Sequence, residues 1–276
     1  MVPAGVWRLP GSGDTRLCTV RRCTIGGVSS EDLTASIPAN APLPASLPRI
    51  DLNADLGEEV TDDRALLAVV SSANVACGYH AGNAEVMRVV CAEAARLGVS
   101  IGAQVSYDDR ANFGRVPLDV EEAVLREQVA DQVGTLRSIA RSEGTDVRYV
   151  KPHGALYHQV LDDEPQARAV LDGSDDLPVL GMRPGHLLRL AAERGRATYD
   201  EAFPDRGYTE AGRLLPRHEP GALVHGAEAV AANAVAFARS GRAHSLCLHG
   251  DSQGAVRTAR AVRAALLGAG FDLVGL

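Results

Sequence analysis

The stretch RIDLNADLGE, residues 49–58, places carboxylates and an amide in a segment that otherwise alternates like a strand. Asp51, Asn53 and Asp55 stand at alternate positions, so in an extended chain their side chains point to one face. Burying two carboxylates and an amide in a core is costly unless they have polar partners. The spacing therefore indicates that this strand presents its polar face to a site.

Polar side chains also follow several later apolar runs. The segments ACGYHAG, VKPHG and CLHGD contain His80, His153 and His249, and Lys151 stands two residues before His153. Imidazoles and carboxylates can transfer protons, and Lys and Arg can stabilise developing negative charge. The other candidates in comparable positions are Gln104, Arg115, Arg206 and Asp251.

Each of these residues also has an ordinary structural explanation. A single His at a strand end is more often a hydrogen-bonded structural residue, and Asp251 precedes a predicted helix that it could cap. Their joint occurrence favours a site, because convergent polar groups at one rim of an α/β fold are the usual form of an active site.

The elements that must position these residues alternate between short apolar runs and helical patterns. Strands are predicted within residues 49–58 and near 70–77, 99–104, 147–150, 177–181, 196–202, 245–250 and 271–274. Helices are predicted after Asn83, which can cap the first, after Asp119 and Glu122, which resemble a capping box, and near 186–194, 227–238 and 252–267. Gly98 is expected to end the first helix.

This alternation predicts an α/β fold with parallel strands covered by helices. Seven or eight such units favour a closed (β/α) barrel, in which chemistry collects at the C-terminal ends of the strands. No GxGxxG follows the first strand, which argues against a dinucleotide-binding fold. We expect one barrel domain over residues 49–276, preceded by a loose tail over residues 1–48 that is rich in Pro, Ser, Ala and Gly.

Composition narrows the function classes. The net charge of −7 argues against nucleic acid or an anionic membrane as a partner, since both need a basic surface. No run of 18 apolar residues occurs, so no transmembrane helix is expected. The 5 cysteines form no CxxC pair, which favours free thiols in a reducing cytoplasm.

Several segments resemble a known family. DLNADLGE, SSANVACGYHAG, NFGR, VKPHGALY, FPDRGY, LLPR, PGALV and CLHGD occur in the order found in the LamB/YcsF family, described as the A-type component of 5-oxoprolinase. The resemblance begins at about Ile50 and continues to the C-terminus. It implies a distorted barrel related to those of polysaccharide deacetylases.

The resemblance also implies an activity and partners. The chain would be one subunit of a complex that opens 5-oxoproline (pyroglutamate) to L-glutamate while hydrolysing ATP to ADP and phosphate. The B and C subunits of 5-oxoprolinase would be its partners and would resemble the two halves of allophanate-hydrolase-type proteins. The chain has no GxxxxGK[ST] loop, so the sequence does not locate the ATP.

Two departures from the family concern a metal. The family often has a His where this chain has Gln104, and an Asp where it has Asn83. A divalent cation such as Mg²⁺ therefore stays an open option, and the sequence assigns no metal ligands. The segment near 162–176 also looks shorter than in the family, so less helix is expected there.

Opening a resonance-stabilised lactam needs positive charge near the carbonyl oxygen or a phosphate, and a base for water. Lys151 and Arg206 could supply the charge, and Asp51, Asp55 or a His the base. The predicted catalytic residues are Asp51, Asn53, Asp55, His80, Lys151 and His153. The predicted substrate- or phosphate-binding residues are Gln104, Arg115, Arg206, His249 and Asp251.

Two alternatives remain open. The chain could be a stand-alone metal-dependent amide hydrolase or deacetylase, with Asp51 or Asp55, His80 and His153 holding Zn²⁺. It could also be a carbohydrate- or metabolite-binding subunit without catalysis of its own. Metal analysis tests the first alternative, and comparing the activity of the isolated chain with that of the assembled complex tests the second.

Overall fold

Parallel strands close into a ring in the computed structural model, which describes residues 47–249 and 254–276. Within these residues the order is β2-β3-β4-β5-β6-β7-β1, and β1 also pairs with β2, so seven strands form a closed barrel. An eighth strand pairs with the start of β1. The strands are β1 Arg49–Leu56, β2 Ser72–Ala76, β3 Ser100–Val105, β4 Val147–Pro152, β5 Val179–Gly181, β6 Thr198–Ala202, β7 Ser245–Leu248 and β8 Asp272–Leu273. The predicted parallel barrel is confirmed.

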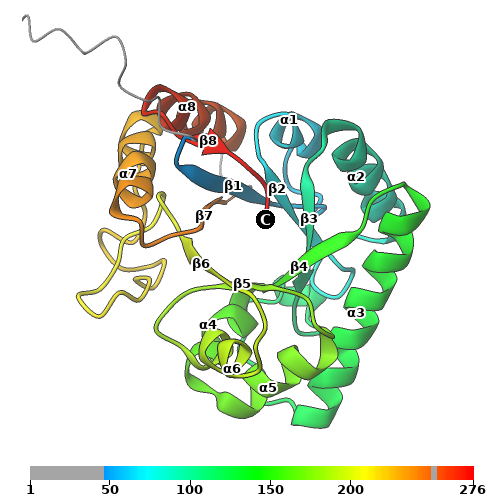
Figure 1. Cartoon of the computed structure of the whole chain (residues 1–276). Coiled ribbons are helices and arrows are strands. Elements are labelled where there is room, and N and C mark those ends of the chain that lie inside the picture. Colours follow the sequence, from blue (N-terminus) through cyan, green and yellow to red (C-terminus); the bar gives the residue numbers. More distant parts are fainter. Residues whose placement is uncertain (1–46, 250–253) are drawn as a thin grey trace, which may run out of the picture. The chain divides into compact units, whose positions relative to one another are not determined.

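Helices surround the ring of strands (Figure 1). They are α1 Asp63–Leu67, α2 Ala84–Leu97, α3 Glu122–Ser142, α4 Gly154–Asp162, α5 Glu164–Gly173, α6 His186–Glu193, α7 Ala227–Ser240 and α8 Ala255–Gly268, with a short 3₁₀ turn η1 Arg110–Asn112. No helix in the described residues is both long and apolar enough to cross a bilayer.

Strand β1 is buried on both faces, and its two faces differ in chemistry. Leu52, Ala54 and Leu56 belong to the main hydrophobic core, while Asp51 and Asn53 on the alternate face are also buried. The apolar core therefore lies where strands meet helices, and the polar face of β1 turns to the barrel interior.

The residues predicted to begin and end helices were correct for α2 and wrong for the start of α3. Asn83 caps α2 as predicted, since its Oδ1 accepts from the amides of Glu85 and Val86, and Gly98 ends the helix with φ 70°. The predicted capping role of Asp119 is wrong, because α3 begins at Glu122 and no side chain caps it. The N-terminal position there is taken by Glu121.

The segment near residues 162–176, where less helix is expected than in the family, is mostly helical. Helix α4 starts directly after KPHG, and α5 follows it, capped by Asp163, whose Oδ1 accepts from the amide of Gln166. Each helix is too short for a long apolar period, which is why the pattern was not visible in the sequence.

The predicted tail over residues 1–48 lies almost entirely outside the described residues. At its end, the carbonyl of Pro48 accepts a hydrogen bond from the amide of Asp272 at the start of β8. Pro48 is therefore joined to the barrel by at least one backbone hydrogen bond.

Candidate active site

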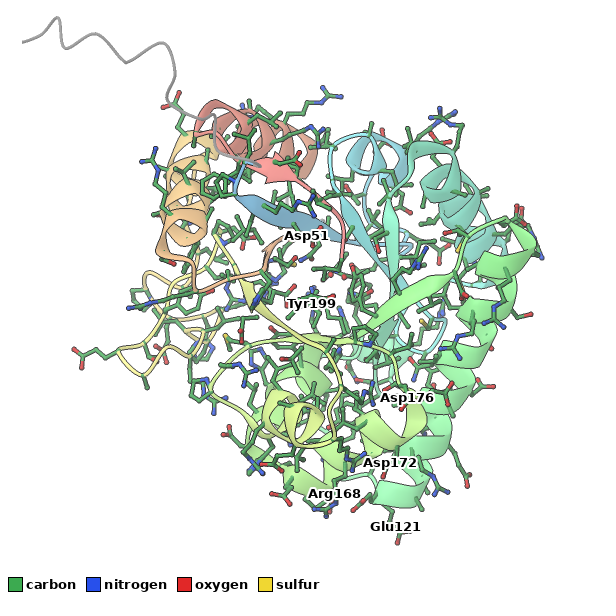
Figure 2. All side chains as sticks on the ribbon, in the orientation of Figure 1. Asp51, Glu121, Arg168, Asp172, Asp176 and Tyr199 are labelled. Atoms are coloured by element: carbon green, nitrogen blue, oxygen red, sulfur yellow. The ribbon has the colours of Figure 1, made fainter. Side chains whose placement is uncertain are left out.

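The first part of the barrel interior is a closed polar network around Asp51. The hydroxyl of Ser71 donates to Asp51 Oδ1 at 2.7 Å, and the hydroxyl of Ser245 donates to Asp51 Oδ2. Asn53 Nδ2 donates to Ser245 Oγ at 2.6 Å and to Glu201 Oε1 at 3.1 Å. Asp51 aligns with Ser245, the first residue of β7, and lies within the ring of strands (Figure 2). Its place is therefore the N-terminal part of the barrel, away from the strand ends where a mouth forms.

The second part of the interior is an ammonium held between two carboxylates. Lys151 Nζ lies 3.0 Å from Asp55 Oδ1 and 2.9 Å from Glu201 Oε1, and its side chain is 3% exposed. Tyr157 donates its hydroxyl to the other oxygen of Glu201 at 2.8 Å. Asn74 Nδ2 donates to Asp55 Oδ1 at 2.9 Å. These contacts fix the position of the ammonium near the C-terminal ends of β1, β4 and β6.

The charges of this group stabilise one another. Burial on its own lowers the pKa of the Lys151 ammonium, but the nearby carboxylates Asp55 and Glu201 outweigh burial and hold that pKa well above its usual range. Burial likewise raises the pKa of Asp55, and the charge of Lys151 outweighs it, so the pKa of this carboxyl is lowered. Lys151 and Asp55 are therefore both ionised at neutral pH.

Behind this group lies a cluster of two imidazoles and one carboxylate. Glu58 Oε1 is 3.7 Å from His80 Nε2 and 3.5 Å from His153 Nδ1, and the two imidazole rings stack with centroids 3.9 Å apart. Gln104 Nε2 donates to Glu58 Oε1 at 3.0 Å and lies 2.9 Å from His153 Nδ1. One ligand atom from each of Glu58, His80 and His153 lies within 4.8 Å of the others.

The donor set of this cluster fits a metal ion. Both ring nitrogens of His80 and Oε1 of Gln104 are buried without a hydrogen-bond partner among the described residues. Burial, aided by His80, lowers the pKa of His153 to about 3, so its imidazole is neutral. His153 Nε2 lies 3.2 Å from the carbonyl oxygen of Phe113, which can only accept, so Nδ1 keeps the lone pair that faces Glu58.

The NFGR segment explains how the two imidazoles are packed. Gly114 has φ 65°, and a Cβ there would overlap Ser106 Oγ and touch His80, so only glycine fits this turn. The ring of Phe113 meets the rings of His80 and His153 edge-on, with centroids 5.6 Å and 5.5 Å away. The loop after β3 thus covers the histidine cluster.

A pocket of about 390 Å³ opens at the C-terminal ends of the strands. Asp55 and Lys151 line its inner part, and residues 214–217 of the long loop between β6 and α7 line its outer part. Arg206 holds that loop, because Nε donates to the carbonyl of Ala222 at 3.1 Å and Nη2 to that of Leu215 at 2.6 Å. The pocket lining is rich in cationic and imidazole side chains, which include Arg115, His158, Arg206, Arg217 and His249.

The structure separates the predicted site residues into groups. The pocket is lined by Asp55, Arg115, Lys151, His153, Arg206 and His249. His80 and Gln104 lie in the histidine cluster, and Asn53 and Asp51 lie deeper in the barrel. Asp251 falls outside the described residues. The carboxylate beside His80 and His153 is Glu58, which corrects the ligand set with Asp51 or Asp55 considered for Zn²⁺.

Sequence reasoning missed three acidic residues and one tyrosine at the site. Glu58 ends the quoted stretch DLGE, and Glu201 ends a predicted strand, so both had a positional signal. Asp205 and Tyr157 lie in the quoted segments FPDRGY and VKPHGALY, but a loop Asp and a helical Tyr are ordinary in sequence. Their partners, His249 and Glu201, become neighbours only in the folded chain.

Comparison with known proteins identifies the family of this chain. The LamB/YcsF family matches residues 50–276, which is most of the chain. The chain belongs to the LamB/YcsF family. A relative from Streptomyces avermitilis, named as the A subunit of 5-oxoprolinase, is 53% identical over 242 residues, covering 80% of this chain and 97% of that protein. One from Agrobacterium fabrum, also named as a 5-oxoprolinase A subunit, is 46% identical over 236 residues, covering 78% of this chain and 92% of that protein.

Solved structures place this LamB/YcsF chain among similar barrels. A lactam utilization protein from Thermus thermophilus superposes with a TM-score of 0.78 at 33% identity, covering 83% of this chain and 100% of that one. The catalytic domain of a peptidoglycan N-acetylglucosamine deacetylase from Eubacterium rectale gives a TM-score of 0.51 at 13% identity, covering 85% and 90%. The second likeness shows the fold alone, and it agrees with the expected relation to deacetylase-like barrels.

Proposed function

We propose that this chain is the A-type component of an ATP-dependent 5-oxoprolinase, which opens 5-oxoproline to L-glutamate with hydrolysis of ATP to ADP and phosphate. The observation that carries the proposal is the pocket with Lys151 fixed between Asp55 and Glu201. The support from relatives is the match to proteins named as 5-oxoprolinase A subunits over nearly their whole length.

The proposed roles follow from what each group can do. The Lys151 ammonium stabilises negative charge that develops on the lactam carbonyl oxygen or on a phosphate attached to it. Asp55, held ionised by Lys151, orients and deprotonates the attacking water. Arg115 and Arg217 on the outer lining attract the carboxylate of the substrate. Asn53 and Asp51 are predicted from the sequence as catalytic. We assign them instead the role of holding together the polar network inside the barrel.

We further propose that Glu58, His80 and His153 hold a divalent cation. Two imidazoles and one carboxylate suit Zn²⁺ or another transition metal better than Mg²⁺, which prefers oxygen ligands. Such an ion, when bound, polarises a carbonyl or lowers the pKa of a bound water. Gln104, where the family often has His, would hydrogen-bond the ligands Glu58 and His153.

The ATP and the partner subunits enter the proposal from the family resemblance and from the relatives' names. Partners of the B and C type would supply much of the nucleotide site, since the chain lacks a GxxxxGK[ST] loop. A cytoplasmic location stays a prediction, consistent with the buried free thiols of Cys77, Cys91 and Cys247.

The test is an omission experiment. The chain is co-purified with its B- and C-type partners, and glutamate formed from 5-oxoproline and ATP is measured with each component left out in turn. Activity that needs all components and ATP is expected. Glutamate formed by the two partners without this chain would overturn the assignment.

The histidine cluster favours one alternative, a stand-alone metal-dependent amide hydrolase. This alternative predicts that the isolated chain, once loaded with Zn²⁺, hydrolyses an amide without ATP. The metal content of the purified chain is compared with that of Glu58→Gln. This comparison tests the cation site without an activity measurement. Bound metal together with strict ATP and partner dependence would reject the alternative and keep the cation site.

A further inference from the structure

A second His–carboxylate pair borders the pocket, apart from the histidine cluster. His249 follows the end of β7, and Asp205 follows the end of β6. His249 Nδ1 lies 2.8 Å from Asp205 Oδ2, and the backbone amide of His249 donates to the same oxygen at 3.3 Å. The ring of Phe203 stacks on the imidazole with centroids 5.5 Å apart. Three contacts thus fix where the imidazole lies.

These contacts also fix which nitrogen is available to a ligand. An ionised carboxylate can only accept a hydrogen bond, so Nδ1 of His249 carries a proton. Burial would raise the pKa of the Asp205 carboxyl, but the charge and hydrogen bonds of His249 outweigh burial and lower it, so Asp205 is ionised. Nε2 lies on the ring edge away from Nδ1, and His249 lines the pocket. The pair presents an oriented imidazole to whatever fills the pocket.

Three other groups that line the pocket and could donate a proton are committed elsewhere. The Lys151 ammonium is held between two carboxylates that keep its pKa well above the usual range. The Tyr157 hydroxyl donates to Glu201, and its pKa is raised by burial. His153 belongs to the cluster beside Glu58. Among the described residues, the titratable and charged groups around His249 are Asp55, Lys151, His158, Asp205, Arg206 and Arg217.

We propose that His249 is the general acid of this pocket and that Asp205 is its positioning residue, an inference that rests on the proposed function. A water oxygen adds to the lactam carbonyl carbon, whose oxygen carries the phosphoryl group transferred from ATP, and gives its proton to a base. The C–N bond then breaks, its electron pair stays on the ring nitrogen, and that nitrogen takes the proton from Nε2 of the imidazolium. His249 is left neutral and regains a proton from solvent, and a second water hydrolyses the remaining acyl phosphate to glutamate and phosphate. An amine leaves far more readily than its anion, so this proton is needed for the bond to break.

The chain contains a matched control. Asp200 and His244 form a comparable pair from the same two strands, with Nδ1 of His244 3.5 Å from Asp200 Oδ2 and 3.0 Å from the Asp200 amide. His244 stands just before β7 and Asp200 lies before the end of β6, while the pocket is lined by the residues after these strands. Replacing this pair changes a His–Asp contact without touching the pocket.

The experiment uses the assembled complex and measures glutamate formation from 5-oxoproline and ATP. His249→Ala is expected to lower kcat by about 100-fold or more with KM within about threefold, and added imidazole is expected to restore part of the rate. Asp205→Asn removes the charge that stabilises the imidazolium. Its kcat should therefore fall with KM within about threefold, and Asp205→Glu, which keeps the charge, should recover part of the rate.

His244→Ala and Asp200→Asn are expected to keep parent kcat and pH profile. A rate for His249→Ala within about threefold of the parent would overturn the inference while leaving the proposed function intact, and so would an equal loss in His244→Ala. A parent complex with no activity would overturn the proposed function and the inference together. If His249→Ala does not fold, as judged by its melting temperature, the kcat values of His249→Gln and Asp205→Asn decide the question.

Discussion

At the scale of single residues, the ion group of Lys151 is the feature on which most of the proposed chemistry depends. Asp55 and Glu201 are buried, and Lys151 is the cation that contacts both of them within the described residues. Breaking a buried pair from one side leaves an uncompensated charge, which is costly. The expected contact between Lys151 and the acidic stretch RIDLNADLGE is present.

Lys151→Met should lower the rate of the assembled complex by roughly 100-fold or more. Without the ammonium, one of the two carboxylates retains a proton to higher pH, so the acid limb of the pH–rate profile should move upward. Lys151→Arg keeps the positive charge and is therefore the control for the position of the acid limb of the pH–rate profile. If the pH–rate profile of Lys151→Met matched that of the parent, Lys151 would not influence the groups whose ionisation controls the rate.

Asp51 offers a test of stability. Burial raises its pKa from 3.8 to about 6, against the hydrogen bonds of Ser245 and Ser71, which lower it. A raised folded-state pKa gives stability that is present below the unfolded-state pKa of 3.8 and is lost as pH rises through about 6. The stability lost over that window is about 3 kcal/mol.

Asp51→Asn should therefore be more stable than the parent at pH 8 and show little gain at pH 4. Thermal melts at both pH values measure this, and the serine contacts reduce the gain to about 1–2 kcal/mol. An equal effect at both pH values would mean that the Asp51 carboxyl is not titrating abnormally. A loss of glutamate formation together with a gain in stability would contradict the purely structural role proposed for Asp51 and return it to the predicted catalytic group.

At the scale of elements, Gly102 and Tyr149 show how neighbouring strands arrange the interior. They are partners in the register of β3 and β4, and a Cβ on Gly102 would overlap the Tyr149 ring. The Tyr149 hydroxyl donates to Asn74 Oδ1 at 2.7 Å, and Asn74 in turn donates to Asp55. Because Gly102 of β3 has no side chain, the Tyr149 ring of β4 has room beside it. Tyr149 in turn supports Asp55 through Asn74.

Gly102→Ala should destabilise the fold by about 1–3 kcal/mol or more, since the ring must move off its position. Gly134→Ala is the matched control. Gly134 lies in α3 with nothing within 4 Å of a new Cβ. The change there should stabilise by about 0.5–1 kcal/mol. Denaturant unfolding of both variants measures this, and equal stabilities would contradict the packing described for Tyr149.

Element prediction succeeded where a local signal was strong. Asn83 and Gly98 set the ends of α2 because each satisfies backbone groups within a few residues. The polar residues after Asp119 looked equally suitable, but α3 begins where its apolar face meets the barrel, so packing overrode the capping signal. Glu121 at that start lies at the periphery of the molecule (Figure 2).

At the scale of the whole molecule, the prediction that residues 1–48 are dispensable remains to be tested. Their composition has too little apolar surface to offset the entropy cost of ordering. A chain that begins at Pro48 keeps the carbonyl that accepts from Asp272. It should fold with a melting temperature within about 2–4 °C of the parent and assemble with its partners.

Soluble expression, melting temperature and co-purification of that shortened chain measure this prediction. A chain that begins at Asp51 is a useful comparison, because it lacks the first residues of β1 that pair with β8. A shortened chain from Pro48 that is insoluble where the parent is soluble would show that the removed residues stabilise the fold.

The sequence by itself determined the parallel barrel, the positions of its strands within a few residues, and the set of polar residues near the strand ends. These follow from short-range periodicity and from motifs within one segment, where the physical cause and the residues are close together in the chain. Only the tertiary structure decided which of those residues meet. Asp51 and Asp55 share a face of one strand, yet Asp51 bonds to serines and Asp55 to Lys151, because β1 places Asp51 beside Ser245 of β7 and Asp55 beside Asn74 of β2, at different depths in the barrel. Glu58 joins His80 and His153, and Asp205 joins His249, through contacts between distant segments, which no local pattern encodes.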